Sequence, residues 1–187
     1  THPTPAPTVS SEPAMSGGYQ IGPDGILVRP AEYAADTYTK PELPEAAKEN
    51  SERGAEAAAE HYLALLVYAW NTGDTQPFAD MSSPTSKFAS DYINDVNEQY
   101  ANGWSYGMES NITHVLRVEP IAANGDDVPE GSILVKFRTE TDDGTSCTRT
   151  KLQPSSSTYK STVTFIMTWR DGGWKEVQGR TVGDNEG

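Results

Sequence analysis

The chain has 187 residues and a formal net charge of −13 at pH 7, and its length suffices for one domain with its own hydrophobic core. A strongly acidic chain without a basic cluster is repelled by nucleic-acid phosphates and anionic lipid headgroups, so we expect neither nucleic acid nor the membrane surface as a partner. Cys147 is the only cysteine, which excludes an intrachain disulfide and a zinc site built from several thiolates.

Residues 1–42 are predicted to form a disordered spacer before the folded domain. Eight of the 13 prolines lie in the first 50 residues, and "THPTPAPTVSSEPAMSGG" is rich in Pro, Ser and Thr. Such a composition buries too little apolar surface to fold, and it suits the mature end of an exported protein or a trimmed chain. The apolar run "ILV" predicts at most a short ordered segment within residues 19–33. We expect the domain itself at residues 43–183 and a tail at 184–187.

The first predicted element of the domain is an amphipathic helix of about 20 residues that begins after Ser51. Its apolar face is formed by residues spaced three or four apart, namely Ala55, Ala59, Tyr62, Leu63, Leu66 and Trp70. Ser51 or Asn50 is the expected N-cap, and Gly73 fits the left-handed residue that commonly follows a helix. His61 lies about 100° away from the apolar face, and we expect it to be exposed to solvent.

The stretch "TGDTQPF" after this helix contains a candidate for chemistry, Asp74. A carboxylate inside a cavity can act as a general base. However, Asp74 follows Gly73 and precedes Pro77, at a helix junction where an aspartate normally accepts backbone N–H bonds. We therefore predict that Asp74 or Thr75 caps a short helix through "QPFADM".

A third helix is predicted in "SSPTSKFASDYINDVNEQYANG", with Ser83 as its N-cap and Pro84 at the first helical position. After Gly103 the apolar period changes from about 3.6 to about 2, which indicates strands, and Asn-Gly and Asp-Gly pairs between them indicate turns. Alternation in "SILVKFRTET" and "YKSTVTFIMTWR" predicts a sheet with one buried face and one wet face. The predicted fold class is α+β, with N-terminal helices packed on a curved, mostly antiparallel sheet.

Two segments carry a resemblance to a known family. "LPEAAKENSERGAEAAAEHYLALLVYAWNTGDTQPF" and "YINDVNEQYANGW" resemble a domain family of unknown function found in actinobacterial lipoproteins, which is similar to the nuclear-transport-factor-2-like (SnoaL-like) superfamily. The resemblance runs from about Leu43 to Val182 and implies a cone-shaped fold. The family often carries two cysteines at the start of the third helix, where this chain has Ser86 and Ala89, so their disulfide is not expected here.

The resemblance further implies export, with a lipidated cysteine upstream of Thr1 that tethers the protein to the outer face of the cytoplasmic membrane. This lipid anchor would be the only contact with the membrane. No activity is implied, because the superfamily holds isomerases, dehydratases, cyclases and binding modules.

Eight aromatic residues are candidates for lining an apolar ligand pocket inside the cone. They are Tyr62, Trp70, Tyr92, Trp104, Tyr106, Phe137, Phe165 and Trp169. Aromatic rings with a few hydroxyl and indole donors suit a small-molecule site. The preferred interpretation is that the same rings fill the core, because a domain of this size needs most of its large apolar side chains for packing.

His114, in "NITHVLRV", is the candidate catalytic base, because a histidine exchanges protons near neutral pH. If Leu116 and Val118 face inward, strand alternation places His114 on the same side. No carboxylate or second base can be named as its partner, so a structural histidine at a strand end or in the core is the preferred interpretation.

No sequence motif predicts a cofactor or a metal. Gly-rich phosphate loops and the motifs G-x-S-x-G, H-E-x-x-H and C-x-x-C are absent from the sequence. The acidic residues at 126–127 and 140–143 flank turn glycines and are interpreted as solvated turns rather than calcium ligands. Arg149 and Lys151 could lower the pKa of Cys147, but a buried, inert thiol is the preferred interpretation.

We therefore predict a domain of the cell envelope that binds a small apolar or amphipathic ligand, or a partner protein, without catalysis. One alternative is an isomerase, dehydratase or cyclase that uses a histidine or carboxylate in the cavity as its base. The other is a homodimer or partner interface on the outer face of the sheet, which Thr162, Thr164, Ile166 and Thr168 would partly form.

Overall fold

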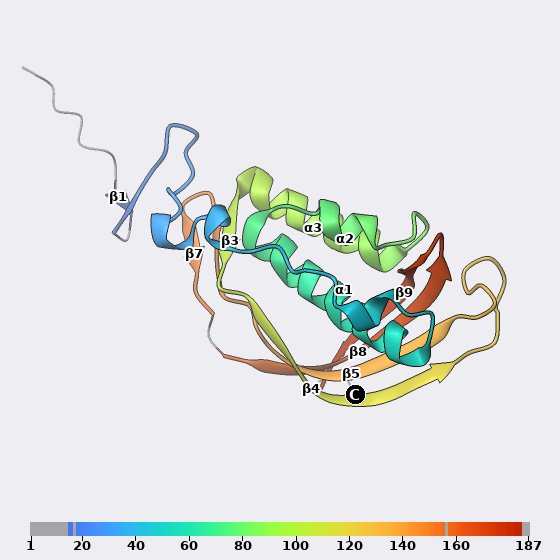
Figure 1. Ribbon diagram of the computed structural model, residues 1–187. Helices are drawn as coiled ribbons and strands as arrows, with labels where there is room; N and C mark the ends of the chain where they lie inside the picture. Colours follow the sequence, from blue (N-terminus) through green and yellow to red (C-terminus); the bar gives the residue numbers. More distant parts are fainter. Residues whose placement is uncertain (1–14, 17, 156, 185–187) are drawn as a thin grey trace, which may run out of the picture.

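After two short strands, the structure continues with helices and then with antiparallel strands (Figure 1). The computed structural model describes residues 15–16, 18–155 and 157–184, so the first 14 residues of the predicted spacer and residues 185–187 of the predicted tail lie outside the described residues. The helices are η1 (Ala31–Tyr33), η2 (Ala35–Thr37), η3 (Glu45–Lys48), α1 (Glu52–Thr72), α2 (Gln76–Asp80) and α3 (Lys87–Asn102). The strands are β1 (Met15–Ser16), β2 (Tyr19–Gln20), β3 (Gly103–Tyr106), β4 (Glu109–Pro120), β5 (Ile133–Asp142), β6 (Thr145–Thr148), β7 (Lys151–Gln153), β8 (Tyr159–Arg170) and β9 (Gly173–Gly183).

Strands β4, β5, β8 and β9 form one antiparallel sheet in that order, and β3, β6 and β7 form a smaller one. Figure 1 shows the larger sheet curved, with α1 and α3 lying over its concave side. The arrangement confirms the predicted α+β class, with N-terminal helices on a curved, mostly antiparallel sheet. Among the described residues, no helix is long and apolar enough to cross a bilayer.

Polar residues at both ends of α1 explain where this helix begins and ends. Ser51 Oγ accepts a hydrogen bond from the Gly54 N–H at 3.0 Å, which satisfies an otherwise unpaired donor of the first turn. Gly73 follows the helix with φ 79°, a left-handed conformation that costs glycine little. Asp74 Oδ1 then accepts the N–H of Gln76 at 3.1 Å, so this carboxylate supports the start of α2.

The start of α3 differs from the prediction, which placed its N-cap at Ser83. The helix begins at Lys87, and Ser86 Oγ accepts the N–H of Ala89 at 3.1 Å. The Ser83 N–H donates instead to the Glu176 carbonyl at 2.7 Å, which ties this residue to β9. A tertiary contact therefore overrides the local Ser-Pro signal.

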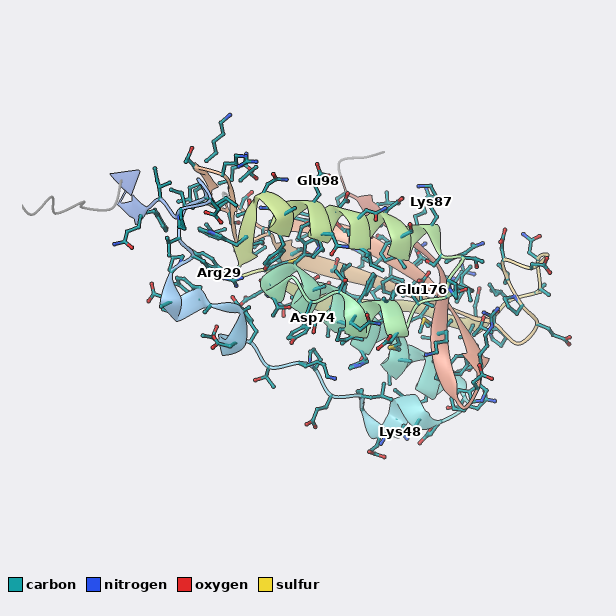
Figure 2. All side chains as sticks on the ribbon, turned by 90° about the horizontal axis from the view of Figure 1, so that it is seen from above. Arg29, Lys48, Asp74, Lys87, Glu98 and Glu176 are labelled. Atoms are coloured by element: carbon teal, nitrogen blue, oxygen red, sulfur yellow. The ribbon has the colours of Figure 1, made fainter. Side chains whose placement is uncertain are left out.

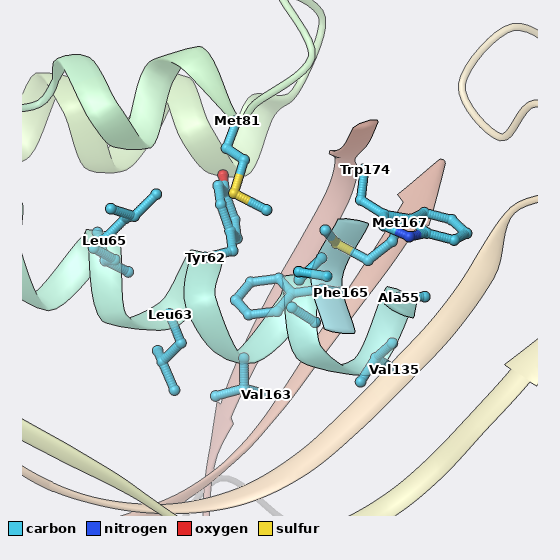
Figure 3. Packing of buried hydrophobic residues seen from close by; sticks show 14 of the residues in the cluster. Ala55, Tyr62, Leu63, Leu65, Met81, Val135, Val163, Phe165, Met167 and Trp174 are labelled. Atoms are coloured by element: carbon cyan, nitrogen blue, oxygen red, sulfur yellow. The ribbon is translucent and has the colours of Figure 1, made fainter. Parts of the chain in front are cut away.

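The main core lies between α1 and the concave face of the sheet (Figure 3). Alternate residues of β5 and β8 point into it, and Val135, Phe137 and Phe165 have no exposed surface. The Phe165 ring packs edge-on against Tyr62 of α1, with 5.0 Å between the ring centroids. The apolar face of these strands is thus the buried face, as their alternation predicted.

The segment before α1 also packs against the domain. Leu27 is buried, and its carbonyl oxygen accepts the indole N–H of Trp104 at 2.7 Å. Arg29 donates through Nη2 to the Asn71 carbonyl near the end of α1, at 2.6 Å. The turns η1 and η2 continue this segment to Thr37, so the ordered chain extends past the stretch 19–33.

Candidate functional site

A cavity of about 350 Å³ lies between the helices and the sheet. It exists because the inward-facing side chains become small toward one end of the core. On β5, Val135 and Phe137 are followed inward by Thr139 and Thr141, and on β8 Ser161 precedes Val163 and Phe165. Thr139 and Ser161 are each only 2% exposed, yet both line the cavity. Short side chains here leave open the space that aromatic rings fill elsewhere in the core.

The two walls of the cavity differ in polarity. Leu63, Leu66 and Trp70 of α1, spaced three and four apart, form an apolar wall together with Tyr92 of α3. The opposite wall presents hydroxyl groups, which belong to Ser105, Ser110, Thr139, Thr141, Ser146, Ser161 and Thr181. A complementary ligand would therefore be apolar on one side and would carry hydrogen-bonding groups on the other.

A tyrosine and a carboxylate interact where the cavity meets the surface. Tyr159 is 44% exposed, and its hydroxyl donates to Asp143 Oδ1 at 2.8 Å. Burial and the neighbouring Asp143 carboxylate raise the pKa of Tyr159, so its hydroxyl stays protonated at neutral pH. Within the described part of the lining there is no Lys, Arg or His, so the Asp143 carboxylate gives the cavity a negative potential.

Of the eight candidate aromatic residues, Trp70 and Tyr92 line this cavity. Tyr62, Phe137 and Phe165 are fully buried in the core instead. These three rings fill the core and do not line a pocket, because each packs against its neighbours between α1 and the sheet. Figure 3 shows Tyr62 and Phe165 within this packing.

The other three candidates lie away from the cavity. Trp104 and Tyr106 stack at 5.6 Å in a smaller cluster that contains Cys147. Burial raises the pKa of the Cys147 thiol, so the lowering suggested by nearby basic residues is wrong. Trp169 packs edge-on against Trp174 at 5.4 Å between ring centroids.

His114 lies on an exposed part of β4 and not in the cavity, so its prediction as a cavity base is wrong. Register shifts between Ile112 and His114 and between Val115 and Arg117 break the strand alternation. Leu116, whose inward orientation was the condition for placing His114 in the cavity, is 46% exposed. The bulges therefore remove the premise that placed the histidine on the inner face.

The outer face of the sheet was the alternative interface. Thr164 and Ile166 line a groove of about 310 Å³ on that face, together with Lys136 and Arg180. Thr168 is buried instead, and its hydroxyl is hydrogen-bonded. Only part of the predicted strand face is thus available at the surface.

Glu176 is a fully buried carboxylate that was not among the predicted site residues. The Tyr62 hydroxyl donates to Glu176 Oε2 at 2.7 Å, and Ser86 Oγ donates to the same oxygen at 2.8 Å. Burial raises the pKa of Glu176. Figure 2 shows Glu176 near the start of α3, marked by Lys87. The carboxylate joins β9 to α1 and α3, and it lies outside the cavity lining.

His61 is buried as well, so the prediction that it faces solvent is wrong. The segment that precedes α1 forms a wall over this face of the helix, with Lys40 and Lys48 lining the same groove as His61. Burial and then Lys40 lower the pKa of His61, which favours the neutral imidazole. Helical periodicity could not reveal this cover, because it comes from outside the helix.

The fold and the cavity define the class of the protein. N-terminal helices that close the concave side of a curved antiparallel sheet around a cavity form a nuclear-transport-factor-2-like cone. Residues 31–179 match the family model described as "Family of unknown function (DUF6318)". The chain therefore belongs to this family. No curated protein matches the sequence.

Solved structures similar to the chain include a putative calcium/calmodulin dependent protein kinase II association domain from Xanthomonas campestris. It has 17% sequence identity and a TM-score of 0.48, and the match covers 80% of this chain and 97% of that chain. A putative scytalone dehydratase from Novosphingobium aromaticivorans has 11% identity and a TM-score of 0.48, over 67% of this chain and 81% of that one. An NTF2-like protein from Anabaena variabilis has 17% identity and a TM-score of 0.37, over 72% of this chain and 92% of that one. Fold alone assigns no function.

Proposed function

We propose that the domain binds a small amphipathic molecule, neutral or cationic, in the cavity between the helices and the sheet. The observation that carries this proposal is the pairing of an apolar wall with a hydroxyl-bearing wall around about 350 Å³. A cavity of this size accommodates a small ligand. Its apolar part would pack against Trp70 and Tyr92, and its polar groups would bond to the hydroxyls of Thr139 and Thr141. Asp143 would disfavour an anion.

A neutral aromatic amine, N-phenyl-1-naphthylamine, can serve as the probe, because its fluorescence rises in an apolar site. We expect saturable enhancement with the wild-type protein. Ser161→Leu should weaken this binding about tenfold or more, because a leucine at a buried, cavity-lining position fills space that the probe needs. Fluorescence titration of both proteins measures the difference.

Thr164→Leu is the matched control, because Thr164 lies on the same strand and lines the groove on the outer face. This variant should bind the probe as the wild type does. Equal binding by the Ser161→Leu variant would contradict the proposed site, provided that its circular dichroism spectrum and melting curve show a folded protein.

We also propose that the protein is exported and held at the outer face of the cytoplasmic membrane by an upstream lipid anchor. The Pro, Ser and Thr-rich composition of residues 1–18 supports this proposal, because such a segment suits a flexible spacer. The full-length protein should be found in the membrane fraction and be cleaved by protease added to intact cells lacking an outer membrane. Recovery from the cytosol would contradict this localisation.

A further inference from the structure

A second groove, of about 650 Å³, lies on a different face of α1 from the cavity. Ala58, His61 and Leu65 line it from the helix, at spacings of three and four residues. Trp174 adds an aromatic surface, and the chain at residues 40–48 forms another side. The groove therefore combines apolar side chains, one histidine and several charged side chains.

His61 is the titratable group that α1 contributes to this groove. Its side chain is only 9% exposed, but no buried side-chain nitrogen or oxygen of the described residues lacks a hydrogen-bond partner, so the ring nitrogens of His61 reach the solvent in the groove. Because His61 lines the groove, a bound molecule can accept a hydrogen bond from its imidazole in place of water.

Charged side chains surround His61 on several elements. Those that line the groove are Lys40, Glu42, Glu45, Lys48, Asp80 and Lys175. Lys48 pairs with Glu45 at 2.6 Å, and Lys175 Nζ donates to the Asp80 carbonyl at 2.6 Å. Among the described residues, Lys40 makes no ion pair and no side-chain hydrogen bond. Lys40 and His61 are thus two cationic or potentially cationic groups, both free to bind the same anion.

We propose that this groove binds a small organic carboxylate, with its charged end between Lys40 and His61 and its apolar part against Trp174 and Leu65. The carboxylate would accept hydrogen bonds from the ammonium and the imidazole, and these bonds are strongest when both donors are charged. It would also offset the repulsion by which Lys40 lowers the pKa of His61. The site is separate from the cavity assigned above, which has a carboxylate and no basic group in its described lining.

Octanoate is a suitable probe, and octanol is its matched neutral control. The histidine ring signals of the full chain are followed by NMR through a pH titration, with and without each compound. We expect octanoate to raise the pKa of His61, because a bound anion favours the imidazolium form, and to leave His114 unchanged. His114 is exposed on β4 and serves as an internal reference. Octanol should not raise the pKa of His61.

Two variants test the named contacts. His61→Gln and Lys40→Gln should each weaken octanoate binding about tenfold, the effect of losing one charge-assisted hydrogen bond. Lys40 is exposed, so its variant has no reason to unfold. The Ser161→Leu variant should bind octanoate as the wild type does, because its change lies in the other site. Three results would overturn the proposal. They are equal pKa shifts of His61 and His114 on adding octanoate, an affinity for octanoate no higher than that for octanol, and loss of octanoate binding in a folded Ser161→Leu variant.

Discussion

Replacing Glu176 by alanine is expected to lower the free energy of unfolding by about 3 kcal/mol, because the change both opens a cavity and removes an acceptor from two buried hydroxyls. The side chain has no exposed surface, and Tyr62 and Ser86 both donate to it. Ser86 also caps α3, so the loss affects the start of that helix. Urea unfolding measures the effect. Gln178→Ala, at an exposed position on the same strand, should change stability little.

Glu176→Gln tests the charge separately. Because burial raises the folded-state pKa of Glu176, the unfolded chain releases its proton first as the pH rises. The wild-type protein therefore loses stability between the ordinary glutamate pKa and the raised one, whereas the glutamine variant has no such loss. The stability advantage of the wild type should shrink as the pH rises above the ordinary glutamate pKa of about 4.3. An advantage that grows with pH would contradict a raised pKa.

Gly54→Ala is expected to destabilise the protein by about 2 kcal/mol, although alanine is normally the better helix former. Gly54 lies in the first turn of α1, and a Cβ there would come within 1.9 Å of the Glu49 carbonyl oxygen. That oxygen accepts the indole N–H of Trp174 at 2.8 Å. The methyl group must therefore displace a backbone segment that holds Trp174 against η3.

The control for this change is Gly173→Ala, where an added Cβ meets nothing within 4 Å. This second variant should keep wild-type stability in the same urea titration. If Gly54→Ala were neutral or stabilising, helix propensity would outweigh the close approach of Glu49, and the packing described for the start of α1 would be wrong.

Much of the fold could be predicted from local patterns. The stripe from Ala55 to Trp70 predicted α1, and the alternation along β5 and β8 predicted which face of the sheet is buried. These signals are reliable because the period of a helix or strand decides which side chains share a face. Gly73 ends α1 for an equally local reason, its left-handed φ.

Features that depend on distant residues could not be predicted in this way. Bulges in β4 turned His114 outward, and no turn residue marks them in the sequence. The partners of Glu176 lie 114 and 90 residues away along the chain. The only local signal for the burial of Glu176 was its position two residues after Trp174, on the same face of β9. His61 was covered by the chain at residues 40–48, which lies outside the helix whose periodicity was used to place this side chain.

The sequence of β5 contains a local signal for the cavity. The inward-facing residues of β5 change from Phe137 to Thr139 and Thr141, so small hydroxyl residues take the place of rings. This change predicts open space only when the register is known, because Ser161 must lie across from Thr139. Pairing of β5 with β8 supplies that register, and it is a tertiary fact.

The central claim is that the space between the helices and the sheet is a ligand site. Intermolecular nuclear Overhauser effects from bound N-phenyl-1-naphthylamine test it most directly, because they report contacts within a few ångströms. We expect contacts from the rings of the probe to the Val163 methyl groups and the Trp70 indole, which line opposite walls. Contacts confined to Leu134 and Ile166 on the outer face, or none at saturating probe, would contradict the account.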